Sequence, residues 1–184
     1  RDVSISMTRI NLLALPVALL MLLVAGTPFV LIHGWNAVAQ SARAFLRPGV
    51  AIPVLLAGIV LHELIHGAAW AFYGEKKLTT IRFGISWSAL APYAHCPEPL
   101  TAGAYRLGAA APGILLGLIP VAIATWIGSS WLFPSGLLFT IAAAGDFLIL
   151  WILRGVPSYL LVQDHPNRAG CLVYESTTDG KSHT

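Results

Sequence analysis

Residues 62–66 read His62-Glu63-Leu64-Ile65-His66, an HExxH pattern with two histidines four positions apart. On a helix this spacing puts both imidazoles on one face, one turn apart, where they can bind the same metal ion. Glu63 lies beside them and can accept a proton from a water molecule on that metal. The pattern therefore predicts metal-assisted hydrolysis, with two metal ligands and a general base.

The HExxH pattern lies within an apolar segment that is long enough to cross a membrane, Val50–Tyr73. A charged side chain at the centre of such a span costs about 2.5–3.5 kcal/mol on insertion scales, so ionisable residues there usually have a function. The alternative is a hydrogen-bonded polar cluster that joins helices. The setting favours a metal site.

The composition is that of an integral membrane protein. Of 184 residues, 57% are hydrophobic and only 10% are charged, whereas soluble domains are roughly 25% charged. We expect one integral-membrane domain over residues 1–175 and a polar tail over 176–184. The net charge of +3 comes without the Lys/Arg-rich run that a nucleic-acid partner would require. Because residue 1 is an arginine, we expect the natural start to be truncated or processed.

Four segments are long enough, or nearly so, to cross about 30 Å of hydrocarbon. They are Leu12–Ile32, Val50–Tyr73, Tyr105–Ile127 and Phe133–Leu153. The first could instead be a signal peptide, but its apolar run is long and lacks a clear cleavage site, which favours a retained helix. The sequence predicts an all-α membrane fold with four transmembrane helices.

The segment Leu78–His95 is rich in residues that favour strands. It predicts a short β-hairpin or re-entrant element between the second and third helices, with Gly84 at a turn or bulge. An open strand edge there could pair with an extended substrate. The alternative is an interfacial loop anchored by Trp87 and Tyr93.

The distribution of positive charge predicts the orientation. Nine Lys or Arg residues fall on the side that holds both termini, against two, Arg43 and Arg47, on the other. By the positive-inside rule, both termini should be cytoplasmic, in the inner (plasma) membrane and in contact with its lipid. Cys96 and Cys171 would then face a reducing compartment and remain free thiols. The nine residues are Arg1, Arg9, Lys76, Lys77, Arg82, Arg106, Arg154, Arg168 and Lys181.

Asp146 is the best candidate for a third metal ligand. His66 precedes Gly74, and Asp146 precedes Arg154, by eight residues each. At 1.5 Å per residue, both side chains lie about 12 Å from the same end of their spans. Gly145 could allow a close helix approach. The alternative role for Asp146 is a helix cap or an interhelical hydrogen bond.

Zinc is the metal that this ligand set favours. A di-iron site would need several carboxylates, and the spans offer only Glu63 and Asp146. Two histidines and one carboxylate could also hold Fe(II). HExxH with a glutamate base nevertheless suits zinc hydrolysis better.

These motifs resemble a bacterial family of integral-membrane proteins described as zincin peptidases, without a settled function. The resemblance rests on HELIH in a second span, Gly145-Asp146, and the tail motif DHPNRAGC at 164–171. The pattern is also similar, more distantly, to that of site-2 proteases, which cut substrates within or near the membrane. The resemblance implies His62, His66 and Asp146 as zinc ligands and Glu63 as the base. Here the third ligand lies in Ala-Gly-Asp-Phe, not in the Asn-Pro or Leu-Asp-Gly setting usual in site-2 proteases. This weakens the case for site-2 mechanics but not for metal binding.

Several residues outside the spans are accessory candidates. His95 could orient substrate or stabilise an oxyanion, although a lone loop histidine is more often only solvated. Asn167 is a second oxyanion candidate. Asp164 and His165 could cap a turn before Pro166. Short strands at 159–163 and 171–174 could cover the cytoplasmic mouth. A second metal site is a further possibility, made from His95, Cys96, Asp164, His165 and Cys171.

The leading hypothesis is a zinc-dependent intramembrane or membrane-proximal metallopeptidase that acts on a membrane-protein or peptide substrate. The first alternative is a non-enzymatic zinc-binding membrane protein, such as a regulator or transport component. The apolar outer half of the spans argues against a transport path. The second alternative is a scaffold that binds partner helices through Gly108, Gly113 and Gly117, although their spacing better suits internal packing. The oligomeric state is not predicted.

Overall fold

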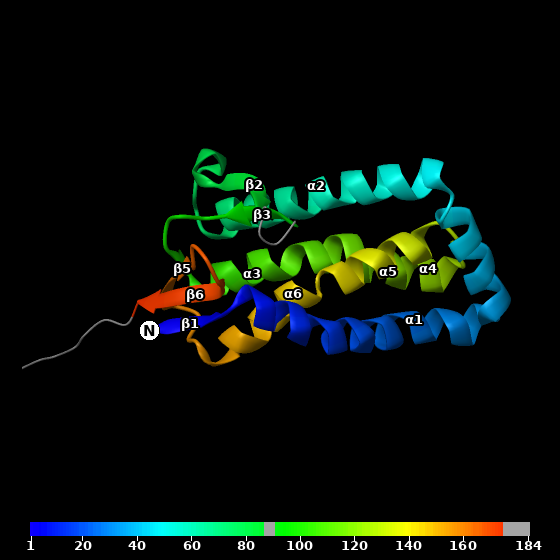
Figure 1. The fold of residues 1–184 in the computed structure, drawn as a ribbon, viewed down its shortest axis with the longest axis horizontal. Helices are drawn as coiled ribbons and strands as arrows, with labels where there is room; N and C mark the ends of the chain where they lie inside the picture. The colour runs from blue at the N-terminus through cyan, green and yellow to red at the C-terminus, as the bar shows by residue number, and fades with distance from the viewer. Residues whose placement is uncertain (87–90, 175–184) are drawn as a thin grey trace, which may run out of the picture.

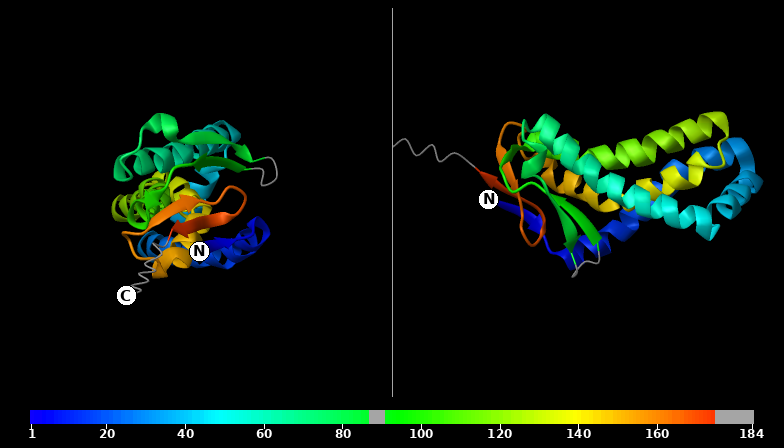
Figure 2. Two further views of the ribbon diagram at one scale, coloured as in Figure 1. Left: turned by 90° about the vertical axis from the view of Figure 1, so that its left-hand side faces the viewer. Right: turned by 90° about the horizontal axis from the view of Figure 1, so that it is seen from above.

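The computed structural model describes residues 1–86 and 91–174. Its helices run side by side along the long axis, and the described strands gather at one end, together with the N-terminus (Figures 1 and 2). In chain order the elements are β1 (Asp2–Ile5), α1 (Met7–Phe45), α2 (Pro48–Tyr73), η1 (Leu78–Thr80), β2 (Arg82–Ser86), β3 (Ala91–His95), β4 (Leu100–Thr101), α3 (Ala102–Pro112), η2 (Gly113–Leu118), α4 (Ile119–Ile127), α5 (Leu132–Ala142), α6 (Ala144–Ile152), η3 (Leu153–Gly155), β5 (Leu161–Asp164) and β6 (Ala169–Tyr174).

The long helix α1 contains the first predicted span. It begins after Ser6, whose hydroxyl oxygen accepts a hydrogen bond from the Arg9 backbone N–H. Its backbone breaks at Gly34, where φ is +77°. Glycine adopts this left-handed conformation without the steric cost that a side chain would add. The last part of α1 therefore runs in a new direction and leads into α2 (Figure 1).

The second and third predicted spans also form helices. α2 begins with Pro48, and after it ends the Gly74 N–H donates to the Trp70 carbonyl oxygen at 2.9 Å. α3, η2 and α4 follow without a gap, so residues 102–127 form one continuous helical segment with a π-helical turn at its centre. Pro112 and Pro120 flank this turn, and neither has an N–H to donate.

The glycines of that central segment pack inside the protein. A side chain at Gly108 would overlap Trp70, and one at Gly117 would overlap Thr140. A side chain at Gly113 would approach Phe147 within 2.7 Å. The internal-packing interpretation of these glycines is thus confirmed. Gly145, in contrast, has no atom within 4 Å of the place of a side chain, so the expected close approach there is wrong.

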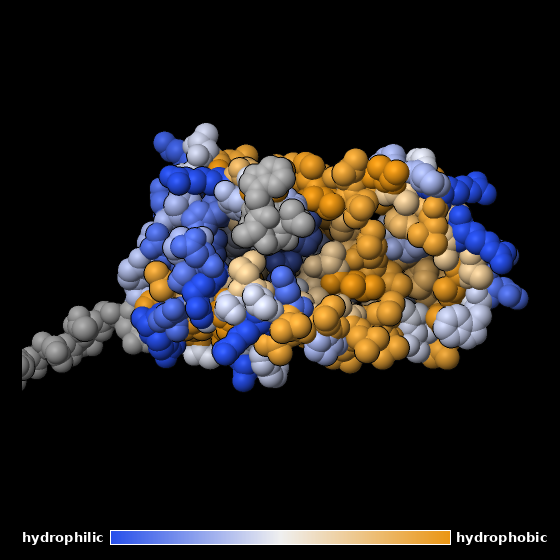
Figure 3. All heavy atoms as spheres, viewed as in Figure 1, coloured by the Kyte–Doolittle hydropathy of each residue, from blue (hydrophilic) through white to orange (hydrophobic). Residues whose placement is uncertain are grey.

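The fourth predicted span is not one straight helix. α5 and α6 are bent by 41° at Ala143, which lies in the run of small residues 142–145. By length and composition, three helices could cross a membrane, namely α1, α2 and residues 102–127, with the bent pair as a possible fourth. Large apolar side chains are exposed along these helices, and they give the helical body its hydrophobic surface (Figure 3). The protein is therefore of membrane type.

A four-stranded antiparallel sheet corrects the all-α expectation. Its order is β1-β6-β5-β4. The two strands expected near 159–163 and 171–174 correspond to β5 and β6, but β1 was not expected. Val3 pairs with Cys171 in this sheet, so the start of the described chain is paired with its end. Both segments are short, so neither carries a local signal for this pairing.

A second sheet contains only β2 and β3, which are antiparallel, between α2 and α3. Gly84 pairs with Tyr93 within this ladder, so its expected place at a turn is wrong. The connection between the strands falls on residues 87–90, and the proposed anchor Trp87 lies outside the described residues.

The largest buried core lies at the strand end of the molecule. It joins α2 and α3 to η1, η3 and the four-stranded sheet through Trp70, Ile81, Leu100, Tyr105, Leu153, Val162 and Val173. A smaller cluster, Phe29, Ala124 and Phe133, lies among the helices. The C-terminal end of α2 and the N-terminal end of α3 are thus anchored in this core.

Candidate metal centre

His62 and His66 project from one face of α2, and their Nε2 atoms lie 3.2 Å apart. The ring planes are steeply inclined, at 79°. Both side chains are largely buried, with 13% and 8% of their surface exposed. Two imidazole nitrogens at this distance cannot both present bare lone pairs to each other at low cost. The pair therefore needs a proton or a cation between its nitrogens.

Asp146 completes the cluster from α6. Its Oδ2 lies 3.2 Å from His62 Nε2, and its Oδ1 lies 3.5 Å from His66 Nε2. The bend at Ala143 puts Asp146 in the first turn of α6, where the helix dipole favours a negative charge. Within the described chain, these three residues are the one group of His, Cys, Asp or Glu whose ligand atoms lie close enough to share a metal ion.

The three residues are close enough to share one zinc ion. Donors about 2.0–2.2 Å from a tetrahedral zinc lie roughly 3.3 Å from one another. His62 Nε2 lies 3.2 Å from both His66 Nε2 and Asp146 Oδ2, and the second carboxylate oxygen, Oδ1, lies 3.5 Å from His66 Nε2. With one ligand atom taken from each residue, all three atoms lie within 4.8 Å of one another. Two neutral imidazoles and one carboxylate are also ligands that zinc prefers, and three of them leave a fourth position open. His62, His66 and Asp146 could therefore hold a zinc ion.

His66 is oriented by α3. Its Nδ1 lies 2.9 Å from the carbonyl oxygen of Gly108. A carbonyl oxygen only accepts, so Nδ1 carries the proton and Nε2 keeps its lone pair for the cluster. The imidazole also stacks on Trp70, with 5.3 Å between ring centroids. Because Gly108 has no side chain, α2 and α3 approach closely enough for His66 Nδ1 to contact the Gly108 carbonyl oxygen.

Glu63 faces a strand and is not part of the ligand cluster. Its carboxylate lies against the backbone N–H of Ala94 in β3. Within the described sheets, β3 pairs with β2 alone. Pro92, two positions before Ala94, has no N–H and suits the same unpaired edge. β3 therefore presents backbone groups toward Glu63.

One cavity of about 760 Å³ joins these groups. His62, Glu63, His66 and Asp146 line one part of it, and residues 92–95 and 164–170 line another. The first turns of α1 supply an apolar wall that includes Ile10. Figure 3 shows the surface hollowed where the hydrophilic end meets the hydrophobic body. Polar molecules can therefore enter from the hydrophilic end and reach the helix segments that carry His62, His66 and Asp146.

The accessory candidates all line this cavity but differ in their contacts. His95 Nδ1 lies 2.7 Å from Asp164 Oδ2, and the Tyr105 hydroxyl donates to Asp164 Oδ1 at 2.9 Å. His165 instead accepts a hydrogen bond from the Asn167 backbone N–H at 3.1 Å. His165 thus caps the turn, as expected, whereas Asp164 holds His95 and Tyr105.

The two cysteines are buried, free thiols. Burial raises the pKa of Cys96, and burial with the nearby Asp164 raises the pKa of Cys171 to about 12. Both thiols therefore stay protonated, unlike cysteines that bind metal. Neither belongs to a metal-sized cluster among the described residues, so the alternative of a second metal site is not supported.

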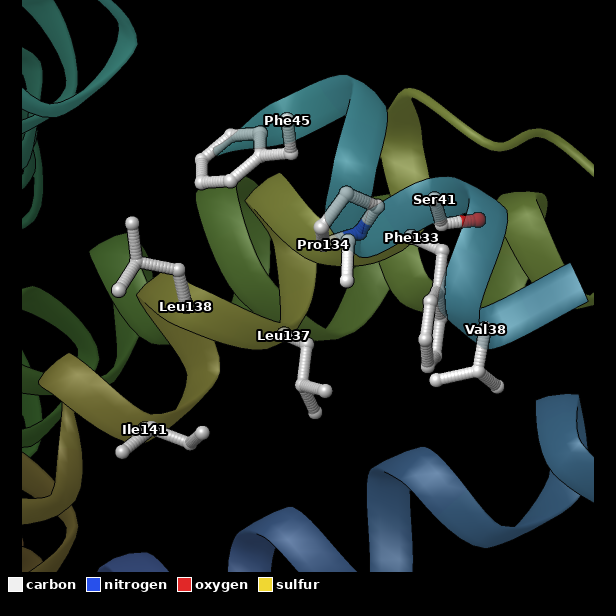
Figure 4. A pocket seen from close by; sticks show the side chains of 9 residues that line it. Val38, Ser41, Phe45, Phe133, Pro134, Leu137, Leu138 and Ile141 are labelled. Carbon is white, nitrogen blue, oxygen red and sulfur yellow. The ribbon is translucent and has the colours of Figure 1, made fainter. Parts of the chain in front are cut away.

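Sequence reasoning missed two contributors, Tyr105 and the carbonyl of Gly108. Neither has a local signal, because a tyrosine or a glycine within a helix is common in any membrane protein. A second cavity, of about 250 Å³, lies between α1 and α5 (Figure 4). Its walls are almost wholly apolar, including Phe45, Phe133 and Leu137, so it offers no groups for hydrolysis.

A family model with the description "Putative zincin peptidase" matches residues 55–161, more than half of the chain. The matched segment contains the HExxH pattern, β2 and β3, residues 102–127, and Asp146. No curated protein and no solved structure matches the chain.

Proposed function

The chain belongs to this family, and on that premise we propose that it is a zinc-dependent metallopeptidase that acts within or near the membrane. The observation that carries the proposal is the cluster of His62, His66 and Asp146, whose ligand atoms lie close enough to share a metal ion, with Glu63 beside it on the wall of one cavity. The family description supports a peptidase, and the ligand set supports zinc.

Each residue of the site has a distinct role in this proposal. His62, His66 and Asp146 hold the zinc ion, which when bound polarises the scissile carbonyl and makes water more acidic. The Glu63 carboxylate takes a proton from the attacking water as the water oxygen bonds to the carbonyl carbon. Glu63 then gives this proton to the amine nitrogen as the C–N bond breaks. The Gly108 carbonyl keeps His66 in the tautomer that binds metal.

The substrate in this proposal is an extended peptide segment of a membrane protein, or a free peptide. A peptide bond inside a helix is hidden by its own hydrogen bonds, whereas a strand exposes it. The edge of β3 faces Glu63 through Ala94 and could pair with such a segment. The apolar wall from α1 would accommodate side chains of a segment that leaves the bilayer.

We further propose that the strand end of the molecule faces the cytoplasm, with both termini on that side of the plasma membrane. The charge bias of nine against two supports this orientation. The cavity opens at the same end, so water can reach it without crossing the hydrocarbon.

The first test is the zinc content of detergent-purified wild type, His66→Ala and Asp146→Ala, with folding checked by thermal unfolding. We expect about one zinc per wild-type chain and little in either variant, because a catalytic zinc site needs its three protein ligands. A folded wild type that takes up no zinc would contradict the proposal.

The second test is peptide cleavage by wild type and Glu63→Gln. Removing the general base should lower the rate by about 100-fold or more while the zinc is retained. This separates a peptidase from a non-enzymatic zinc protein, in which Glu63 would have no task. Equal cleavage by both proteins would favour that alternative.

A further inference from the structure

Three elements meet at Asp164, on the cavity wall formed by the two sheets. Its Oδ2 contacts His95 Nδ1 from β3 at 2.7 Å, and its Oδ1 accepts the Tyr105 hydroxyl from α3 at 2.9 Å. Both carboxylate oxygens are therefore occupied. Asp164 and His95 are 17% and 24% exposed, so the pair is partly desolvated.

This contact decides how His95 faces the cavity. An ionised carboxylate only accepts hydrogen bonds, so the proton of the contact lies on Nδ1. Nε2 is the ring nitrogen left for a ligand. An imidazolium that donates Nδ1–H to a carboxylate has one further donor, Nε2–H, and it is this group that a ligand in the cavity would meet. The Tyr105 hydroxyl fixes the carboxylate from the other side, which limits rotation of the imidazole.

β3 brings His95 close to the catalytic base. The Ala94 backbone faces the Glu63 carboxylate, and His95 is the next residue, one Cα step of about 3.8 Å along the strand. Both side chains line the same cavity. A peptide that lies along the edge of β3 would therefore pass Glu63 and His95 together.

We propose that His95 is a second catalytic residue, which donates a hydrogen bond from Nε2 to the oxygen of the scissile carbonyl as negative charge develops there. Asp164 and Tyr105 are its positioning residues. His95 keeps its proton throughout, while the water proton goes to Glu63 and then to the leaving amine. This inference rests on the proposed peptidase function and assigns the oxyanion donor of the site.

The other candidates for this role are less suitable. His165 uses Nδ1 to accept the Asn167 backbone N–H within its own turn, and no carboxylate holds it in a fixed direction among the described residues. It therefore serves as the matched control, because it lines the same wall of the cavity.

The experiment uses zinc-loaded full chain and internally quenched peptides whose cleavage depends on Glu63. We expect His95→Ala to lower kcat by about 100-fold with little change in KM, as for the loss of one oxyanion donor. His95→Gln keeps an amide donor and should recover part of this loss. Asp164→Asn should lower kcat by about 10-fold, and His165→Asn should stay within about twofold of wild type.

A binding measurement separates catalysis from structure. A phosphinic peptide carries the negative charge of the transition state, so His95→Ala should weaken its binding by at least about tenfold while zinc content and Tm stay unchanged. Unchanged kcat and unchanged phosphinic affinity in His95→Ala would overturn the inference and leave the peptidase proposal intact if Glu63→Gln is inactive. Cleavage by Glu63→Gln at the wild-type rate would instead overturn both.

Discussion

The His66 side chain is held by contacts at both ring nitrogens and at the face of its ring. Nε2 faces His62 and Asp146, Nδ1 donates to the Gly108 carbonyl, and the ring face stacks on Trp70. A histidine held in this way loses little freedom on binding a metal, which favours affinity. The same principle applies to His95, whose orientation depends on Asp164.

The buried thiol of Cys171 leads to a prediction about alkaline stability. Its pKa is raised to about 12, from 9.0 in the absence of burial. Above about pH 9 the unfolded chain loses this proton but the folded chain keeps it, so unfolding releases a proton. The stability from the protonated thiol is fully present below pH 9 and is lost as the pH rises toward 12.

We therefore expect the Tm of wild type to fall more steeply between pH 9 and 12 than the Tm of Cys171→Ala, measured by thermal unfolding in detergent. The comparison is between the slopes of Tm against pH and not between the Tm values, since the smaller alanine side chain lowers the stability at every pH. Parallel slopes would contradict the protonated thiol.

At the scale of elements, one helix bend and one close helix contact build the site. The bend at Ala143 creates a new helix start for Asp146. The close contact of α2 with α3 at Gly108 brings a backbone carbonyl to His66. Both features occur where side chains are small, at residues 142–145 and at Gly108.

Gly108→Ala tests the contact between α2 and α3. Its methyl carbon would lie 2.0 Å from an atom of Trp70, so the indole must move away. Overpacking of this kind costs roughly 1–3 kcal/mol of unfolding free energy. Since Trp70 stacks on His66, we also expect weaker zinc binding, measured by competition with a chelating dye.

Gly49→Ala is the matched control. It lies in α2, where a side chain would meet nothing within 4 Å, and alanine favours helix by up to about 1 kcal/mol. We expect its stability and zinc affinity to match or exceed those of wild type. Equal effects of the two substitutions would show that the contact at Gly108 has no special role.

At the scale of the whole molecule, the helical body and the strand end differ in surface and in packing. Large apolar side chains are exposed along the helices, while the main core and the cavity lie toward the strands (Figure 3). This polarity suits a protein whose helices contact lipid and whose site opens at one membrane surface.

Cysteine labelling tests the proposed orientation. Cys96 and Cys171 are buried, so they need not be removed first. In intact cells, a membrane-impermeant maleimide should label Gly49→Cys, at the start of α2, but should label Lys77→Cys only after permeabilisation. The wild-type chain is the control for background labelling. The reverse pattern would mean that the strand end faces outward.

The sequence by itself determined the features that depend on local spacing. The HExxH pattern put two histidines on one helix face because the α-helical period fixes which residues are neighbours. Apolar runs indicated the membrane segments, and residue counts from their ends matched the depth of Asp146 to that of His66. The roles of these residues in zinc binding and catalysis remain predictions.

Only the tertiary structure decided the features that depend on contacts between distant segments. The bend before Asp146, the pairing of β1 with β6, the Gly108 carbonyl at His66, and the Asp164 carboxylate between His95 and Tyr105 each join segments that carry no mutual signal in one sequence. Local propensity describes a residue and its near neighbours, whereas these contacts form because packing brings whole helices and strands together. The candidate ligands could thus be chosen from the sequence, but not the groups that orient them.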